Sequence, residues 1–79
     1  MPIKPHDCKL ARIFAANVRA RRQALHFSQE ELAERAQVHR TYVGMIERCE
    51  KNVTIFNIER FAKALKIPAY ELLREPERT

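Results

Sequence analysis

The chain has 79 residues, of which 46% are hydrophobic and 32% charged, a balance typical of one small soluble globular domain. No run approaches the roughly 18 apolar residues that a membrane span requires, and the polar segment Met1–Asp7 is not a secretory signal. Fifteen Lys and Arg residues outnumber ten Asp and Glu, and the whole excess of +5 lies in residues 1–29. This basic balance indicates a polyanionic partner such as DNA, although many basic proteins bind none.

The chain begins with a segment that contains Pro2 and Pro5, so we expect residues 1–6 to form a flexible arm. Asp7 is then the candidate N-cap of a helix that runs to about Ala24. Apolar residues recur at helical spacing along this helix: Leu10, Ala11, Ile13, Phe14, Val18 and Leu25. Its other face carries Lys9, Arg12, Arg19 and Arg21, a set that alone indicates only a solvated surface.

The stretch Ser28–Arg48 predicts two short helices joined by a tight turn. Ser28 and Glu31 have the spacing of a capping box, in which the hydroxyl accepts the Glu31 N–H and the carboxylate accepts the Ser28 N–H. Hydrophobic staples flank both helix starts: Phe27 with Leu32, and Val38 with Val43 around His39 as the second cap. Two short helices with a shared apolar seam make a helix-turn-helix motif.

The C-terminal third predicts two more helices after a polar loop at 49–52. Thr54 is the cap of an amphipathic segment that ends at Lys66, and Pro68 begins a short last helix. The apolar residues of these two helices are Ile58, Phe61, Ala62, Leu65, Tyr70, Leu72 and Leu73. Since no strand-like alternation or repeat is present, we expect an all-α fold: a compact five-helix bundle forming one domain, with residues 76–79 as a flexible tail.

Arrangements typical of enzymes are largely absent from the sequence. A single glycine excludes a glycine-rich phosphate loop, and His6-Asp7-Cys8 is the one local cluster that resembles metal ligands. Structural zinc needs four ligands, so we do not expect this cluster to hold a metal. We also expect no cofactor, no small-molecule ligand and no enzymatic activity. Cys8 and Cys49 are expected to be free thiols, with no role that the sequence assigns.

Chemistry suited to DNA is found on the second helix of the motif. Four residues are expected to face away from its core positions Val43 and Ile46: Arg40, Thr41, Gly44 and Met45. Arginine bonds bidentately to O6 and N7 of guanine, and threonine contacts a base or a thymine methyl group. Gly44 would let the helix approach closely. The alternative for Arg40 is a solvated charge.

These residues carry a resemblance to a known family. Small and apolar positions of a twenty-residue motif starting at Gln29 are filled by Leu32, Ala33, Ala36, Val38, Val43 and Ile46. On this pattern the chain resembles the Cro and phage-repressor (Xre-type) helix-turn-helix family from about Leu10 to Glu75. The run RTYVGMIER, followed by NVTIFNIERFAKAL, is most similar to the controller proteins of restriction-modification systems.

The resemblance implies a role for several residues. Phosphate contacts are implied for Ser28, Gln29, Arg19, Arg21 and Tyr42. The alternative for Tyr42 is that it supports Arg40. Base contacts are implied for Arg40 and Thr41. Arg22 and Glu47 match a buried or half-buried ion pair between the first and third helices. Glu30 and Glu34 match acidic positions through which a related repressor contacts RNA polymerase; the alternative is that they complement the helix dipole.

The sequence departs from the family at three positions where glycine is common. These positions are occupied by His26, Gln37 and Cys49. Each must adopt a positive φ, at a cost of roughly 1 kcal/mol relative to glycine, or use a different turn.

Assembly follows from size, because one recognition helix contacts only a few base pairs. We expect a cytoplasmic homodimer on a palindromic double-stranded operator, regulating its own gene and an endonuclease gene. The residues expected at the dimer interface, which alternatively close the monomer core, are Ile55, Phe56, Ile67, Tyr70 and Leu73. Two alternatives stay open: a repressor of a phage or mobile element, and an antitoxin-like protein-interaction module.

Overall fold

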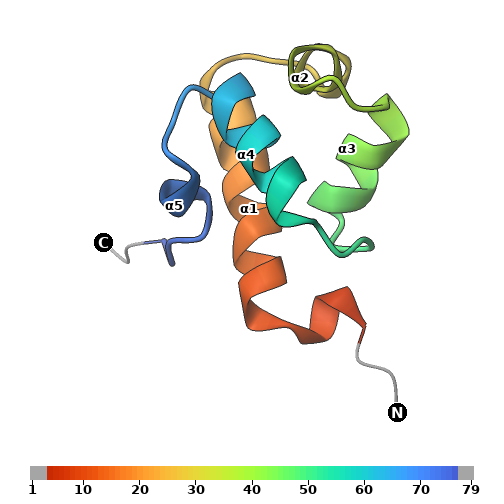
Figure 1. Cartoon of the computed structure of the whole chain (residues 1–79), viewed down its shortest axis with the longest axis vertical. Coiled ribbons are helices and arrows are strands. Elements are labelled where there is room, and N and C mark those ends of the chain that lie inside the picture. The colour runs from red at the N-terminus through yellow and green to blue at the C-terminus, as the bar shows by residue number, and fades with distance from the viewer. Residues whose placement is uncertain (1–3, 77–79) are drawn as a thin grey trace.

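The computed structural model describes residues 4–76. A short 3-10 helix, η1 (Pro5–Asp7), precedes five α-helices: α1 (Lys9–Ala24), α2 (Gln29–Ala36), α3 (Arg40–Glu47), α4 (Ile55–Ala64) and α5 (Ala69–Leu72). Figure 1 shows α2 and α3 on one side of α1 and α5 on the other. The described residues form no strand, so the predicted all-α five-helix fold is confirmed. None of the helices in this part of the chain is long and apolar enough to span a membrane.

The start of the chain differs from the prediction. Pro5 opens a 3-10 turn because its fixed φ suits the first position of a helix, and the Asp7 carboxylate accepts a hydrogen bond from the Lys4 N–H at 3.3 Å. Asp7 is therefore part of η1, and the N-cap of α1 is Cys8, without a side-chain hydrogen bond. Of the expected arm and tail, residues 1–3 and 77–79 lie outside the described residues.

The core forms where the five helices meet. Its largest fully buried side chains are Phe14, Phe61, Leu32, Ile46, Leu65, Leu72, Val18 and Val43. Phe14 and Phe61 make an edge-to-face contact with ring centroids 6.0 Å apart, a favoured aromatic geometry. The predicted apolar faces are thus confirmed, with two exceptions. Leu10, in the first turn of α1 at the edge of the core, is 50% exposed, and Tyr70 on α5 is 68% exposed.

Three helix starts are capped as the sequence predicts. Ser28 Oγ accepts the Glu31 N–H at 2.9 Å, His39 Nδ1 accepts the Thr41 N–H at 3.1 Å, and Thr54 Oγ1 accepts the Asn57 N–H at 3.0 Å. Each bond satisfies a backbone donor that has no partner within its helix.

The reciprocal half of the predicted capping box at Ser28 is not formed. The Glu31 carboxylate instead accepts hydrogen bonds from Arg35 Nε and Nη2 at 3.2 and 3.0 Å, one turn further along α2. An arginine at i+4 offers a cationic donor, which a glutamate binds in preference to a neutral backbone N–H.

The ends of α1, α2, α3 and α4 share one geometry. A non-glycine residue adopts a left-handed conformation at each end, with φ between 58° and 61°: His26, Gln37, Cys49 and Lys66. The next N–H then donates to the carbonyl five positions back, as in the bond from Val38 to Ala33 at 2.9 Å. The expected positive φ at the three glycine-like positions is confirmed, whereas Lys66 was not foreseen.

Two side chains that the sequence did not single out bind helix ends from a distance. Arg60 on α4 donates through Nε to the Ala36 carbonyl at 3.0 Å and through Nη2 to the Gln37 carbonyl, at the end of α2. Asn17 on α1 donates through Nδ2 to the Leu72 carbonyl at 3.0 Å, at the end of α5. These bonds fix α2 and α5 relative to the core.

Because Gln37 is strained at positive φ, Gln37→Gly should raise the free energy of unfolding by about 0.5–1 kcal/mol. Urea unfolding at a fixed protein concentration measures this change. Glu34→Gly, in the interior of the same helix, is the matched control and should lower stability by about 0.5–1 kcal/mol. Equal losses in the two variants would show that Gln37 stores no strain.

Candidate nucleic-acid interface

The exposed start of α3 is the part of the motif best placed to meet a ligand. Arg40 and Thr41 are the first two residues of the helix, and both are exposed. The His39 side chain caps this end of α3 by accepting the Thr41 backbone N–H. Arg40 Nε lies 3.8 Å from Glu30 Oε1 on α2, and both side chains are largely exposed. Arg40 and Thr41 are therefore exposed at the start of α3, away from the core, as expected.

The other end of α3 is fixed by the ion pair that the resemblance implied. Arg22 Nε donates to Glu47 Oε2 at 2.6 Å and Nη2 donates to Oε1 at 3.0 Å, with side-chain exposures of 13% and 4%. Arg22 Nη1 also donates to the Phe27 carbonyl at 2.9 Å. The hydrogen bond to Glu47 raises the pKa of Arg22 despite its partial burial. Because these contacts join α1, α3 and the loop before α2, they fix the position of the motif.

Gln29, the first residue of α2, joins this cluster. Its amide Nε2 donates to Glu47 Oε1 at 3.1 Å. The amide therefore helps hold α2 against α3, a contact that the sequence did not predict. The backbone N–H groups of the first turn of α2 still point out of the helix start, as at every helix N-terminus.

Gly44 is not exposed, because the Arg48 side chain covers it on the side of α3 away from the core. It is buried, and a Cβ at this position would lie 3.0 Å from Arg48 Nη1. The Arg48 guanidinium is held there by Glu50, with Nε to Oε2 at 3.1 Å. Glycine thus gives the Arg48 guanidinium room to lie against α3, whereas Met45, the next residue, is half-buried.

Tyr42 points toward α4 and not toward Arg40. Its hydroxyl accepts a hydrogen bond from Asn57 Nδ2 at 3.1 Å, and its ring stacks on Phe61 with centroids 6.1 Å apart. The expectation that Tyr42 supports Arg40 is therefore wrong, because helical spacing turns residue 42 onto the side of α3 that packs on the core. Its hydroxyl can still donate one hydrogen bond.

The arginines of α1 divide between two faces of the helix. Arg19 and Arg22 are three residues apart and share a face, whereas Arg21 lies on the other side. Arg21 Nε donates to the Leu65 carbonyl at 2.9 Å and so binds the end of α4. The expectation that Arg21 is free for phosphate is therefore corrected. Arg19 is exposed and binds no partner among residues 4–76.

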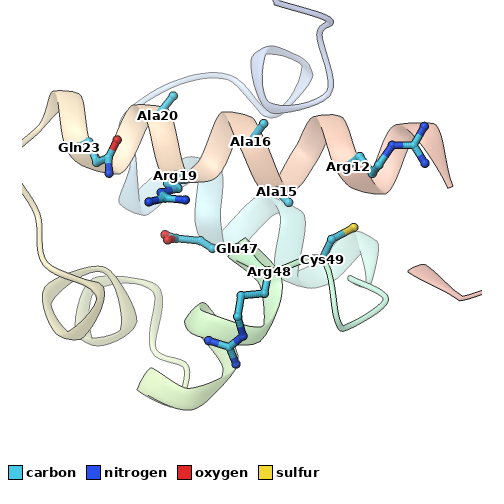
Figure 2. Close-up of a pocket in the computed structure, with 9 residues that line it drawn as sticks. All are labelled: Arg12, Ala15, Ala16, Arg19, Ala20, Gln23, Glu47, Arg48 and Cys49. Carbon is cyan, nitrogen blue, oxygen red and sulfur yellow. The ribbon is translucent and has the colours of Figure 1, made fainter. Parts of the chain in front are cut away.

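Arg19 borders an open groove of about 380 Å³ between α1 and the end of α3. In Figure 2 its guanidinium points toward the Glu47 carboxylate, whereas Arg48 extends away from α1 along α3. The lining residues are Arg12, Ala15, Ala16, Arg19, Ala20, Gln23, Glu47, Arg48 and Cys49. Since Glu47 is neutralised by Arg22, the groove is basic overall.

A separate apolar surface lies on α4 and α5. Ile55, Phe56 and Tyr70 are 86%, 67% and 68% exposed. Ile67 and Leu73, which were also expected at a dimer interface, are partly buried and pack against the core of their own chain. Each of the two alternatives for these five residues therefore fits a part of the set: Ile67 and Leu73 close the core, and Ile55, Phe56 and Tyr70 remain exposed.

The cysteines and histidines of the described chain offer little for catalysis. Residues 4–76 contain no group of three or more His, Cys, Asp or Glu side chains able to hold a metal ion. Cys8 and Cys49 are free thiols. Burial raises the pKa of the Cys49 thiol, so it remains protonated at neutral pH and is a weak nucleophile.

Comparison with known proteins finds relatives that are helix-turn-helix proteins and control proteins. A family model described as helix-turn-helix matches residues 18–72. The control protein C.SmaI from Serratia marcescens is 48% identical over 61 residues, which cover 77% of this chain and 73% of that protein. A crystal structure of a hypothetical transcription factor from Neisseria is 39% identical, covers 96% of this chain and 87% of its own, and has a TM-score of 0.84.

A third relative was crystallised with DNA. It is the restriction-modification controller protein C.Esp1396I, whose structure is a tetramer in complex with its natural 35-base-pair operator. Its chain is 29% identical to this one, with a TM-score of 0.78, and the match covers 84% of this chain and 91% of that chain.

The buried ion pair generates a stability prediction. Glu47→Ala should lower the free energy of unfolding by about 3–5 kcal/mol, because it leaves the Arg22 guanidinium without its carboxylate. Urea unfolding monitored by circular dichroism measures the loss. Glu31→Ala, which removes the exposed pair with Arg35, should cost less than about 1 kcal/mol.

A double variant keeps this prediction testable if Glu47→Ala does not fold. Arg22→Met combined with Glu47→Leu removes both charges and should be clearly more stable than Glu47→Ala alone. A loss in Glu47→Ala no larger than that in Glu31→Ala would contradict the structural role of the pair.

Proposed function

We propose that this chain, which belongs to the helix-turn-helix family of DNA-binding transcription regulators, controls the genes of a restriction-modification system. Its relatives include control proteins of such systems, one of them crystallised on its operator. The observation that carries the proposal is the capped, exposed start of α3, where Arg40 and Thr41 stand on a helix fixed by the Arg22–Glu47 pair. We assign a binding function and no enzymatic activity, and we assign the protein to the cytoplasm, where its DNA lies.

The reading surface is the start of α3, inserted in the major groove of DNA. A helix fits this groove, and its N-terminal residues reach the base edges. Arg40 recognises a guanine through O6 and N7, and Thr41 contacts an adjacent base. Met45, half-buried one turn along, supplies an apolar contact, and Gly44 acts by admitting Arg48 rather than by touching DNA itself.

The phosphate contacts flank this surface. The N-terminus of α2, at Ser28 and Gln29, offers backbone N–H groups to an anion, as helix starts do. Arg19 supplies a cation on the face of α1 next to the Arg22–Glu47 pair. Tyr42 retains a hydroxyl hydrogen for phosphate, and Arg21 is left out because its Nε is bound to the Leu65 carbonyl and it lies on the other side of α1 from Arg19.

A homodimer on a palindromic operator follows from the small size of one reading surface. One recognition helix contacts a few base pairs, so two-fold symmetry doubles the number of base pairs read and raises the affinity far above that of one chain. The exposed apolar residues Ile55, Phe56 and Tyr70 supply the surface for this association.

Regulation then depends on the concentration of the protein itself. At low occupancy the dimer activates its own gene and the endonuclease gene, and at high occupancy it represses them. Activation requires a contact with RNA polymerase. Of the two acids on α2 that the resemblance linked to that contact, Glu34 has no partner among residues 4–76, so we assign the contact to Glu34.

Removal of the guanidinium at the reading surface should reduce sequence discrimination. Arg40→Ala should weaken binding to the operator by about 1–3 kcal/mol and relax the preference at one position in each half-site. Titrations with duplexes that vary that position measure both effects. Equal weakening on every sequence would contradict the base-reading role of Arg40.

Loss of a phosphate contact should lower affinity without changing sequence preference. Arg19→Ala should weaken binding to all sequences alike and reduce the slope of log K against log salt by about 1. Lys63→Ala on α4, paired with Glu59, is a matched loss of one charge and should leave the slope unchanged. A change in sequence preference with Arg19→Ala would contradict its assignment to the DNA backbone.

The dimer proposal is tested by mass in solution. Sedimentation at micromolar concentration should give the mass of two chains, and Phe56→Glu should shift it toward one chain, because a charge in an apolar interface is costly to desolvate. Lys63→Glu, an exposed change on the same helix, should leave the dimer intact. A single-chain mass for the unchanged protein would refute the proposal.

A further inference from the structure

The three acidic residues at the start of α2 differ in what they contact. Glu31 binds Arg35 on its own helix, and Glu34 has no partner in the described part of the chain. Glu30 alone reaches the neighbouring helix, where its Oε1 lies 3.8 Å from Arg40 Nε. One carboxylate is thus directed at the side chain to which the proposed function assigns base reading.

Arg40 has little else to hold it. It is the first residue of α3, at the positive end of the helix dipole, which disfavours a cation. Its side chain is 63% exposed, and among residues 4–76 Glu30 is its one charged partner. Because both groups are solvated, the pair contributes little to the stability of the fold.

We propose that Glu30 is a specificity-determining residue that orients the Arg40 guanidinium for base recognition. The contact is made at Nε, the inner nitrogen of the group. The two terminal nitrogens remain available for the paired acceptors O6 and N7 of guanine, which bidentate recognition requires. Glu30 acts through Arg40 and does not itself touch a base.

Orientation before binding affects discrimination for two reasons. A side chain already held in the bound geometry loses less conformational entropy when DNA arrives. A carboxylate near the arginine also removes orientations in which the guanidinium would reach a neighbouring base or a phosphate, and so disfavours incorrect sequences. The inference depends on the proposed function, because it needs Arg40 to read a base.

The test uses the full chain and a duplex that the unchanged protein enriches from a random-sequence library. Binding is measured for this duplex and for duplexes carrying each other base at the position that Arg40→Ala affects. Glu30→Gln removes the charge while keeping the shape of the side chain. Glu34→Gln is the matched control, since it removes the same charge from the same helix at a side chain without a partner among residues 4–76, and the assay contains no RNA polymerase, the partner assigned to Glu34.

We expect Glu30→Gln to reduce discrimination at that position by roughly three- to tenfold, a part of what a bidentate arginine supplies. Glu34→Gln should leave discrimination unchanged. In the Arg40→Ala background, Glu30→Gln should have no further effect on discrimination, because the two residues act as one unit. A general change in affinity from the lost charge should be the same in both glutamine variants.

Two results would overturn the inference in distinguishable ways. If Arg40→Ala relaxes one position but Glu30→Gln behaves like Glu34→Gln, Glu30 does not orient Arg40, and the proposed function stands. If the unchanged protein enriches no sequence, or Arg40→Ala alters no position, both the inference and the base-reading role of Arg40 fall.

Discussion

The bidentate ion pair between Arg22 and Glu47 joins α1 to α3, and it is the centre of the contacts that hold the three helices on which the proposed function depends. Glu47 is the last residue of α3, so the pair holds that helix at its far end and leaves its first residues free to project. Gln29 adds a contact from the start of α2, and Arg22 also holds the loop before it through the Phe27 carbonyl. A largely buried charge pair of this kind is costly to break on one side only. The reading and phosphate-binding surfaces therefore keep a fixed relation to each other.

A second constraint on this fold is that its helices must end without glycine. With one glycine in 79 residues, the chain ends four helices with side chains larger than hydrogen in the left-handed region. Two of these ends are supported by hydrogen bonds from elsewhere: Arg60 binds the Ala36 carbonyl at the end of α2, and Arg21 binds the Leu65 carbonyl at the end of α4. Long-range contacts of this kind offset the strain that each non-glycine residue introduces. The turn between α2 and α3 is thus defined by tertiary structure as much as by local sequence.

Much of the fold could be predicted from the sequence because its signals are local. The caps at Ser28, His39 and Thr54 and the apolar spacing of α1 and α4 each depend on residues within one or two turns. The Arg22–Glu47 pair and the turn conformations were expected only through the resemblance to a family.

The contacts that escaped prediction are tertiary. Arg21 and Arg19 look equivalent in sequence, but only the packing of α4 shows that Arg21 is occupied by the Leu65 carbonyl. Gly44 was expected to be exposed, and its cover by Arg48 depends on a loop residue, Glu50. Helical spacing places Tyr42 on the core side of α3, but only the packing of α4 supplies its partner Asn57. Assignments to a helix face are reliable for apolar residues, whereas long polar side chains depend on which backbone groups the fold leaves unpaired.

The central claim is that α3 of this chain reads a two-fold symmetric DNA site. A footprint on the DNA immediately upstream of the protein's own gene tests it most directly. We expect two protected half-sites of related, inverted sequence with centres about one helical turn apart, since a two-fold dimer presents two recognition helices to one face of the duplex. Protection that is absent, or that covers unrelated sequences without inverted symmetry, would contradict the claim.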